Sequence, residues 1–241
     1  MLENFLNKLN NYEELIYKLI KTWFVFALFF NSYLFQYIPI ILFKIPSENL
    51  SDTMNVFLST FSSILLLIIL VILYRNDLKK DWKIFKNNLM ENLNIGFSYW
   101  VIGVVIMMAS NIIINFCFKG GTAANEQTVQ SMITAVPWLM VISAGFLAPF
   151  TEELVFRKSL RDVLHSKYFF AFVSFLIFGG AHVMGNVNNY VDLLFIIPYG
   201  ALGYVFALAY YKTNTIFTSI SLHMFHNTVL VIFSIIAASI L

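Results

Sequence analysis

Long apolar runs separated by short polar segments recur along almost the whole chain. A transmembrane helix needs about 20 consecutive apolar residues. The runs that approach this length lie at 22–43, 55–74, 95–118, 137–156, 168–184, 190–211 and 214–241. Only 12% of the 241 residues are charged, against roughly 25% in a typical soluble domain. These runs predict an all-α, polytopic transmembrane helix bundle of seven spans, or eight if the last run breaks near Asn227.

The segment 1–21 precedes the first apolar run and mixes apolar residues with Asn, Lys and Glu. Its apolar residues recur at helical spacing and are Leu2, Phe5, Leu9, Tyr12, Ile16 and Leu19. This pattern predicts an amphipathic helix in the membrane interface. No signal-peptide cleavage site follows the first run, so we expect that run to be retained. Residues 22–241 show no repeat or linker and are predicted to form one integral membrane domain.

The basic residues alternate between the two sides of the predicted bundle. Thirteen of the 15 lysines and arginines fall in segments that would share one side, including five in the connecting loop expected at 75–94. The positive-inside rule then predicts a multi-pass cell-membrane protein with a cytoplasmic amino terminus. The net charge of +2 is too small to indicate a nucleic-acid partner. The single cysteine, Cys117, excludes an intrachain disulfide and is expected to be a packing residue.

Ionisable residues within the apolar runs are concentrated in the second half of the chain. The four histidines are His165, His182, His223 and His226. Intramembrane ionisable side chains usually face the bundle interior and mark functional sites. The earlier runs offer only Asn111 and Asn115, one helical turn apart, which we expect to form interhelical hydrogen bonds.

Two adjacent glutamates stand in the stretch TEELVFR. If this stretch is helical, Glu153 and Arg157 lie four residues apart on one face and can form an ion pair. Glu152 points about 100° away and has no such partner in its own helix. Glu153 is therefore expected to be structural, whereas Glu152 is available to accept a proton from water. The alternative is that both glutamates are polar packing residues.

Two histidine motifs follow on later helices. In FGGAHV, His182 comes after small residues at 179–181 that allow close approach of a neighbouring helix. In SLHMFHN, His223 and Asn227 share one helical face, whereas His226 points elsewhere and is expected to be a core or boundary residue. One intramembrane histidine alone is best explained by hydrogen bonding. Three motifs on three separate helices favour a functional site.

These motifs resemble those of a known family. EELVFR resembles the EExxxR motif, FGGAH the FxxxH motif and HMFHN the HxxxN motif of the CAAX prenyl protease and bacteriocin-processing family, also called the ABI family of intramembrane glutamic proteases. The resemblance covers 137–232, which we take as the expected catalytic core. The amino-terminal half resembles the family only in being hydrophobic.

The resemblance implies a role for each motif residue. Glu152 would be the general base that activates a water, and His182 would hold and polarise that water. His223 and Asn227 would donate hydrogen bonds to the oxyanion at the scissile carbonyl. Glu153 and Arg157 would orient this group. The implied function is a cofactor-free intramembrane endopeptidase that acts on a membrane-associated or small secreted peptide or protein.

Three alternatives remain at this stage. Two histidines and a glutamate can bind a catalytic zinc, although the HExxH pairing on one helix is absent. A non-catalytic immunity or scaffold protein would use the same fold without turnover, but it has no need of all four catalytic residues. A proton-coupled transporter would also use intramembrane carboxylates, but no repeated halves are visible in the sequence.

Glu152 and His182 are predicted to lie at different depths in the membrane. A rise of about 1.5 Å per residue places Glu152 about 8 Å from the inner face and His182 about 21 Å from it, so that they would not meet. We therefore expect the fourth helix to continue through 157–165, with its basic residues snorkelling or facing a wet cavity. The sixth run is expected to line this cavity through Tyr199, Gly200, Gly203 and Tyr204.

Overall fold

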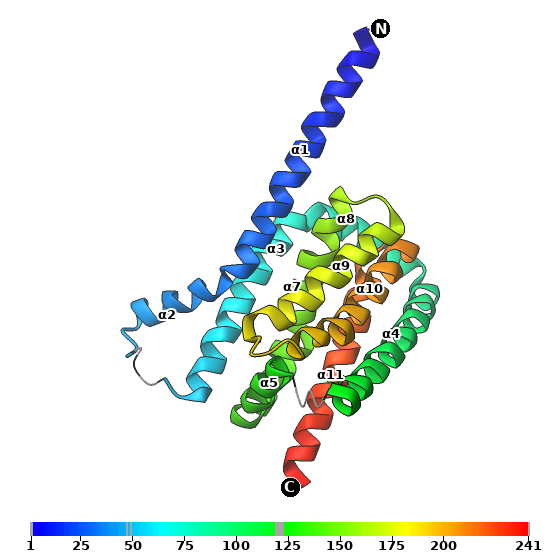
Figure 1. Ribbon diagram of the computed structural model, residues 1–241. Coiled ribbons are helices and arrows are strands. Elements are labelled where there is room, and N and C mark those ends of the chain that lie inside the picture. The colour runs from blue at the N-terminus through cyan, green and yellow to red at the C-terminus, as the bar shows by residue number, and fades with distance from the viewer. Residues whose placement is uncertain (1, 47, 49, 119–122, 241) are drawn as a thin grey trace.

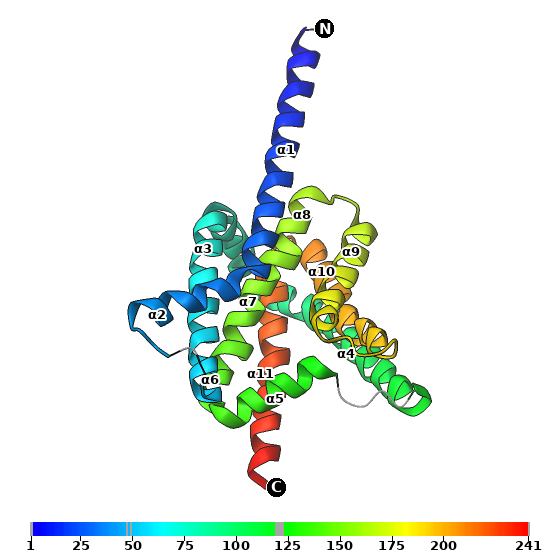
Figure 2. The ribbon, with the colours of Figure 1, turned by 60° about the vertical axis from the view of Figure 1, so that its left-hand side comes forward.

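The computed structural model describes residues 2–46, 48, 50–118 and 123–240. These residues form helices joined by turns, with no strand among them. The helices assemble into one bundle, and the two ends of the chain lie at opposite ends of it (Figure 1, Figure 2). The predicted all-α helix bundle is confirmed.

The helices follow one another with short connections. In chain order they are α1 (Leu2–Phe30), η1 (Ser32–Gln36), α2 (Tyr37–Leu42), α3 (Asp52–Asn87), α4 (Leu89–Phe118), α5 (Ala124–Ala135), α6 (Pro137–Ile142), η2 (Ser143–Leu147), α7 (Ala148–Glu153), η3 (Leu154–Lys158), α8 (Ser159–Val163), α9 (Lys167–Val183), η4 (Met184–Asn186), η5 (Asp192–Phe195), α10 (Ile196–Thr213) and α11 (Ile216–Ile240). The elements η2 and η3 are π-helical turns. They join α6, α7 and α8 into one continuous helix.

Within the described residues, five helical segments are long and apolar enough to cross a membrane. They are Asp52–Asn87, Leu89–Phe118, Pro137–Val163, Asp192–Thr213 and Ile216–Ala238. The first predicted run lies in a helix pair bent by 52°, and the fifth lies in the shorter apolar helix Lys167–Val183. The protein is thus a multi-pass membrane protein. The break considered near Asn227 is not present, because α11 runs continuously through this residue.

Two segments expected outside the spans are also helical. The predicted interfacial segment 1–21 is continuous with the first run in α1, whose amino-terminal part extends beyond the bundle (Figure 1). Its location in the membrane interface stays a prediction. The side chains of residues 2–9 are not among those that the structure describes. The segment 75–94 is not a loop, because α3 ends at Asn87 and α4 begins at Leu89.

Small residues set the distance between α9 and α10. A Cβ added to Gly179 would lie 2.6 Å from the carbonyl oxygen of Ile196, and one added to Gly203 would lie 2.9 Å from that of Ser174. Real Cβ atoms do not approach so closely, so glycine allows the two backbones to touch. The expectation that Gly200 and Gly203 line a cavity is wrong, because both pack against α9.

The largest buried cluster joins α1, α3, η3, α9, α10 and α11. Its members include Leu70, Phe156, Phe170, Ala207 and Ile220. Because η3 directly follows the two glutamates, this core fixes the helix that carries them.

The start of α11 is anchored to α3. The N–H of Ile216 donates to Oδ2 of Asp81 (2.8 Å), and the hydroxyl of Thr215 donates to the carbonyl oxygen of Asp81 (2.9 Å). The Asp81 carboxylate thus caps the helix that carries His223 and Asn227, although it belongs to another helix.

Removing this cap is expected to destabilise the protein. Asp81→Ala leaves the Ile216 N–H without its acceptor and should cost about 0.5–2 kcal/mol of stability, as at other N-caps. Thermal unfolding in detergent measures the loss. Asp81→Asn keeps an acceptor oxygen and should lose less. An equal loss in both variants would mean that the cap is not the cause.

Candidate active site

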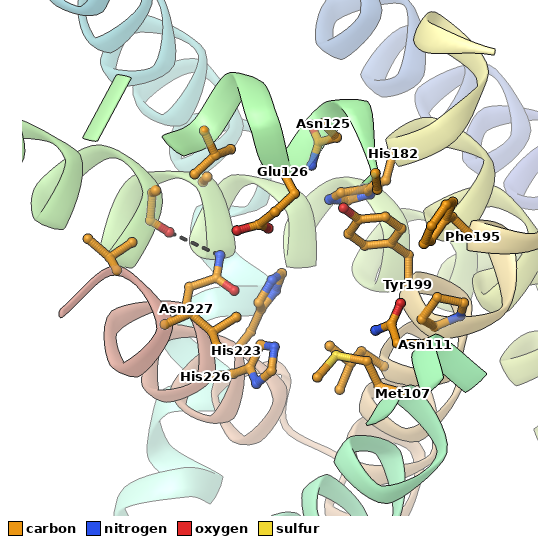
Figure 3. Close-up of a pocket in the computed structure, with 18 of the residues that line it drawn as sticks. Met107, Asn111, Asn125, Glu126, His182, Phe195, Tyr199, His223, His226 and Asn227 are labelled. Atoms are coloured by element: carbon orange, nitrogen blue, oxygen red, sulfur yellow. Dashed lines mark hydrogen bonds between the residues drawn. The ribbon is translucent and has the colours of Figure 1, made fainter. Parts of the chain in front are cut away.

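A cavity of about 500 Å³ lies among α4, α5, α7, α9, α10 and α11. All four residues predicted to be catalytic line it: Glu152, His182, His223 and Asn227. Figure 3 shows the latter three reaching it from α9 and α11. The structure therefore brings together the three motifs that the sequence places far apart.

Two π-helical turns frame the short helix that carries Glu152. The helix begins at Pro137 and continues to Val163, with η2 before α7 and η3 after it. The predicted continuation of the fourth helix beyond Arg157 is confirmed. π-helical turns are rare in proteins, and those that occur are often found at functional sites.

Pro149 explains how α11 attaches to this helix. Proline has no N–H, so a carbonyl oxygen one turn earlier lacks its helical donor. Asn227 donates through Nδ2 to the carbonyl oxygen of Ala144 (3.0 Å). The hydroxyl of Thr228 donates to the next carbonyl oxygen, that of Gly145 (3.4 Å). The Asn227 amide is therefore held by one N–H, and its second N–H is not used in this contact.

Glu153 and Arg157 form the predicted ion pair. Both side chains are fully buried, with 3.1 Å between Nη1 of Arg157 and Oε1 of Glu153. The guanidinium also lies over the ring of Phe178, 4.2 Å from its centroid. Arg157 was expected to snorkel or to face a wet cavity, and it does neither, because it is fully buried beside the carboxylate that supplies its counter-charge.

Lys158, like Arg157, was expected to snorkel or face a wet cavity and is instead paired inside the bundle. It is buried and pairs with Asp162 one turn later and with Asp77 of α3, at 3.3 Å. Arg161 lies over the ring of Tyr211, 4.5 Å from its centroid. Lys158 and Arg161 therefore contact side chains of the bundle, whereas they were expected to extend to the membrane surface or into a wet cavity.

His223 connects the two glutamates. Its Nδ1 donates to Oε1 of Glu153 (2.9 Å), and its Nε2 lies 3.7 Å from Oε2 of Glu152. Oε2 of Glu152 has no hydrogen-bond partner among the described residues. Helix spacing separates Glu152 from Glu153 but does not predict that one histidine contacts both.

The ring of His182 is held on three sides. Its Nδ1 donates to the carbonyl oxygen of Phe178 (2.8 Å), since a carbonyl can only accept. Its ring lies 4.4 Å from the Phe178 ring and stacks on Tyr199 with 4.8 Å between centroids. In the neutral ring, Nε2 is then the acceptor nitrogen.

Other polar residues of the cavity differ from their expected roles. His226 is buried as predicted, accepts a hydrogen bond from Nε1 of Trp100 (3.3 Å) and also lines the cavity. Asn115 donates to the carbonyl oxygen of Asn111 (3.0 Å) within α4, and both line the cavity. Within the described part of the chain, the hydrogen bond that joins these two asparagines lies inside α4, whereas interhelical bonds were expected.

Sequence reasoning missed the contribution of α5. This helix brings Asn125 and Glu126 to the cavity. They lie in a polar segment between two apolar runs, which resembles an extramembrane loop. No spacing within that segment indicates contact with the site.

A metal site would need several His, Cys, Asp or Glu side chains close enough to share one ion. Among the described residues, no group of three or more His, Cys, Asp or Glu side chains is arranged to hold a metal ion. Glu152, His182 and His223 line the same cavity without forming such a group.

The bundle, with a Glu–His–Asn cluster lining its cavity, defines a multi-pass membrane protein that carries carboxylates among its helices. Residues 134–229 match the family described as type II CAAX prenyl endopeptidase Rce1-like. This range contains all six predicted site residues. The chain belongs to this family.

Curated relatives agree with this assignment. The chain is 30% identical over 182 residues to YdiL of Bacillus subtilis, whose name describes a candidate membrane peptidase; the match covers 72% of this chain and 70% of YdiL. It is 28% identical to the membrane-embedded CAAX protease MroQ of Staphylococcus aureus, covering 56% of this chain and 57% of MroQ. No solved structure matches the chain. These comparisons support a membrane peptidase.

Proposed function

We propose that this protein is an intramembrane endopeptidase that hydrolyses a peptide bond with a water activated by Glu152 and His182. The observation that carries the proposal is the convergence of Glu152, His182, His223 and Asn227 on one cavity inside a membrane bundle. Membership of a peptidase family supports the same reaction.

Glu152 and His182 suit the activation of water. A water between them donates one hydrogen to Oε2 of Glu152 and the other to Nε2 of His182. As the water oxygen bonds to the scissile carbonyl carbon, Glu152 takes the proton and later passes it to the departing amine nitrogen. The C–N bond breaks, and the products are a carboxylic acid and an amine.

His223 and Asn227 suit stabilisation of the oxyanion. Asn227 has a second N–H beyond the one bound to Ala144, and fixed donors in a low-dielectric site stabilise developing negative charge. His223 is held by Glu153 through Nδ1, and Nε2 is the ring nitrogen that remains for the oxyanion. Glu153 and Arg157 then act as positioning residues.

The substrate is proposed to be a membrane-associated or small secreted peptide or protein that enters from the bilayer or its surface. The name of MroQ, a CAAX protease, is consistent with a peptide substrate. The amino terminus is proposed to be cytoplasmic, as the lysine and arginine distribution indicates.

The proposal is tested by incubating the purified protein in detergent with lipidated and unlipidated peptides, with and without a chelator. Mass spectrometry identifies the products. We expect hydrolysis of at least one peptide, unchanged by the chelator. Loss of cleavage with chelator would replace this mechanism by a metal-dependent one. If no peptide is cleaved, the endopeptidase proposal fails and a binding protein of the same fold is favoured.

Removing the amide donor is expected to slow the chemical step. Asn227→Ala should lower kcat by about 10²–10³-fold, as loss of one oxyanion donor does elsewhere, with a smaller change in KM. Steady-state kinetics on the best peptide measures both constants. Thr228→Val is the matched control, because it removes only the adjacent contact to Gly145 and should keep activity. Equal losses in both variants would indicate that α11 packing, rather than the donor, is responsible.

A further inference from the structure

The cavity holds a second carboxylate that the proposed hydrolysis does not use. Glu126, in the first turn of α5, lines the cavity together with Glu152. Figure 3 shows its carboxylate pointing into the cavity that His182, His223 and Asn227 also line. No lysine or arginine is among the described residues of the lining. Among the described residues of the lining, the carboxylates are therefore not offset by a lysine or an arginine.

Glu126 is held in place by neutral neighbours. Gln130, one turn later, donates through Nε2 to Oε1 of Glu126 (2.9 Å) and also to Oγ of Ser234 on α11 (2.9 Å). In the described part of the chain, no Lys, Arg or His lies within ion-pair distance of Glu126. One carboxylate oxygen is thus fixed, and its charge has no protein counter-ion there.

The placement of Glu126 needs a reason beyond helix stability. An acidic residue in the first turn favours the helix dipole, but a side chain turned to solvent would serve that purpose equally. Here the carboxylate lines the same cavity as Glu152, and like charges within one cavity repel. A cation bound in the cavity would remove this repulsion.

We propose that Glu126 is a specificity-determining residue that binds a positively charged group of the peptide substrate. An ammonium or guanidinium group has the charge and the N–H donors that the carboxylate requires. Its source is a lysine or arginine side chain near the scissile bond or a free α-amino group. Asn125 and Asn111 also line the cavity and add neutral hydrogen-bonding groups to it. This inference rests on the proposed peptidase function.

The test uses matched fluorescent peptides that carry lysine, arginine, norleucine or glutamate at one position, scanned on both sides of the cleavage site. Each peptide is made with a free and an acetylated amino terminus, which separates the two sources of positive charge. Cleavage is measured with the wild type, Glu126→Gln and Glu126→Lys. Binding of the same peptides is measured in the Glu152→Gln background, with and without Glu126→Gln. Glu91→Gln, which removes an exposed charge of α4, is the control.

We expect the wild type to prefer a cationic peptide over its neutral match by about tenfold or more in kcat/KM, a modest effect for a close charge pair. Glu126→Gln should reduce this ratio to near one, Glu126→Lys should favour glutamate, and Glu91→Gln should keep the wild-type ratio. The same ratio in wild type and Glu126→Gln would overturn the inference. If no peptide is cleaved, the peptidase proposal fails, and the binding ratios decide the inference: a cationic preference that Glu126→Gln removes supports it, and no such loss overturns it.

Discussion

Glu152→Gln is expected to abolish peptide cleavage while leaving the fold intact. Glutamine keeps the size of the side chain but cannot take a proton from water, so the rate should fall by at least about 10²–10⁴-fold, the contribution of a general base. Cleavage of the best peptide by the purified variant measures the loss. Its thermal unfolding should stay close to that of the wild type.

A matched variant separates this effect from a general change of charge. Glu91→Gln removes a carboxylate from the exposed start of α4 and should cleave at the wild-type rate. Residual activity of Glu152→Gln near the wild-type rate would assign the base to another group. Retained binding without cleavage would show that the variant still admits the substrate.

Arg157→Ala is expected to be the most destabilising single substitution in the site. It leaves the fully buried Glu153 carboxylate without its cation, and breaking a buried ion pair in this way costs about 3–5 kcal/mol. It also opens space against the ring of Phe178, over which the guanidinium lies. The yield of folded protein and its thermal unfolding in detergent report the loss.

Two further variants identify the cause of that loss. Arg161→Ala removes a partly exposed arginine that contacts Tyr211 and should have a small effect. The double variant Glu153→Gln with Arg157→Met removes both charges and should be more stable than Arg157→Ala alone, because no uncompensated charge remains. A double variant as unstable as the single one would assign the loss to packing instead.

Local pattern predicts much of this protein. Apolar runs of sufficient length predict helices, because backbone groups in lipid must be paired within the segment. The spacing of four residues predicts the Glu153–Arg157 pair. These inferences succeed because each depends on a single helix, whose geometry is regular.

Only the tertiary structure decided which faces meet. The contact of His223 with both glutamates, the hydrogen bond from Asn227 to Ala144 and the entry of Glu126 into the cavity all join different helices. The burial of Lys158 beside Asp77 likewise depends on how α3 lies against the helix of the site. Helical periodicity specifies which residues share a face. The position of one face against another is set by close contacts such as Gly179 against Ile196 and by hydrogen bonds such as that from Asn227 to Ala144. Neither forms until the helices have packed.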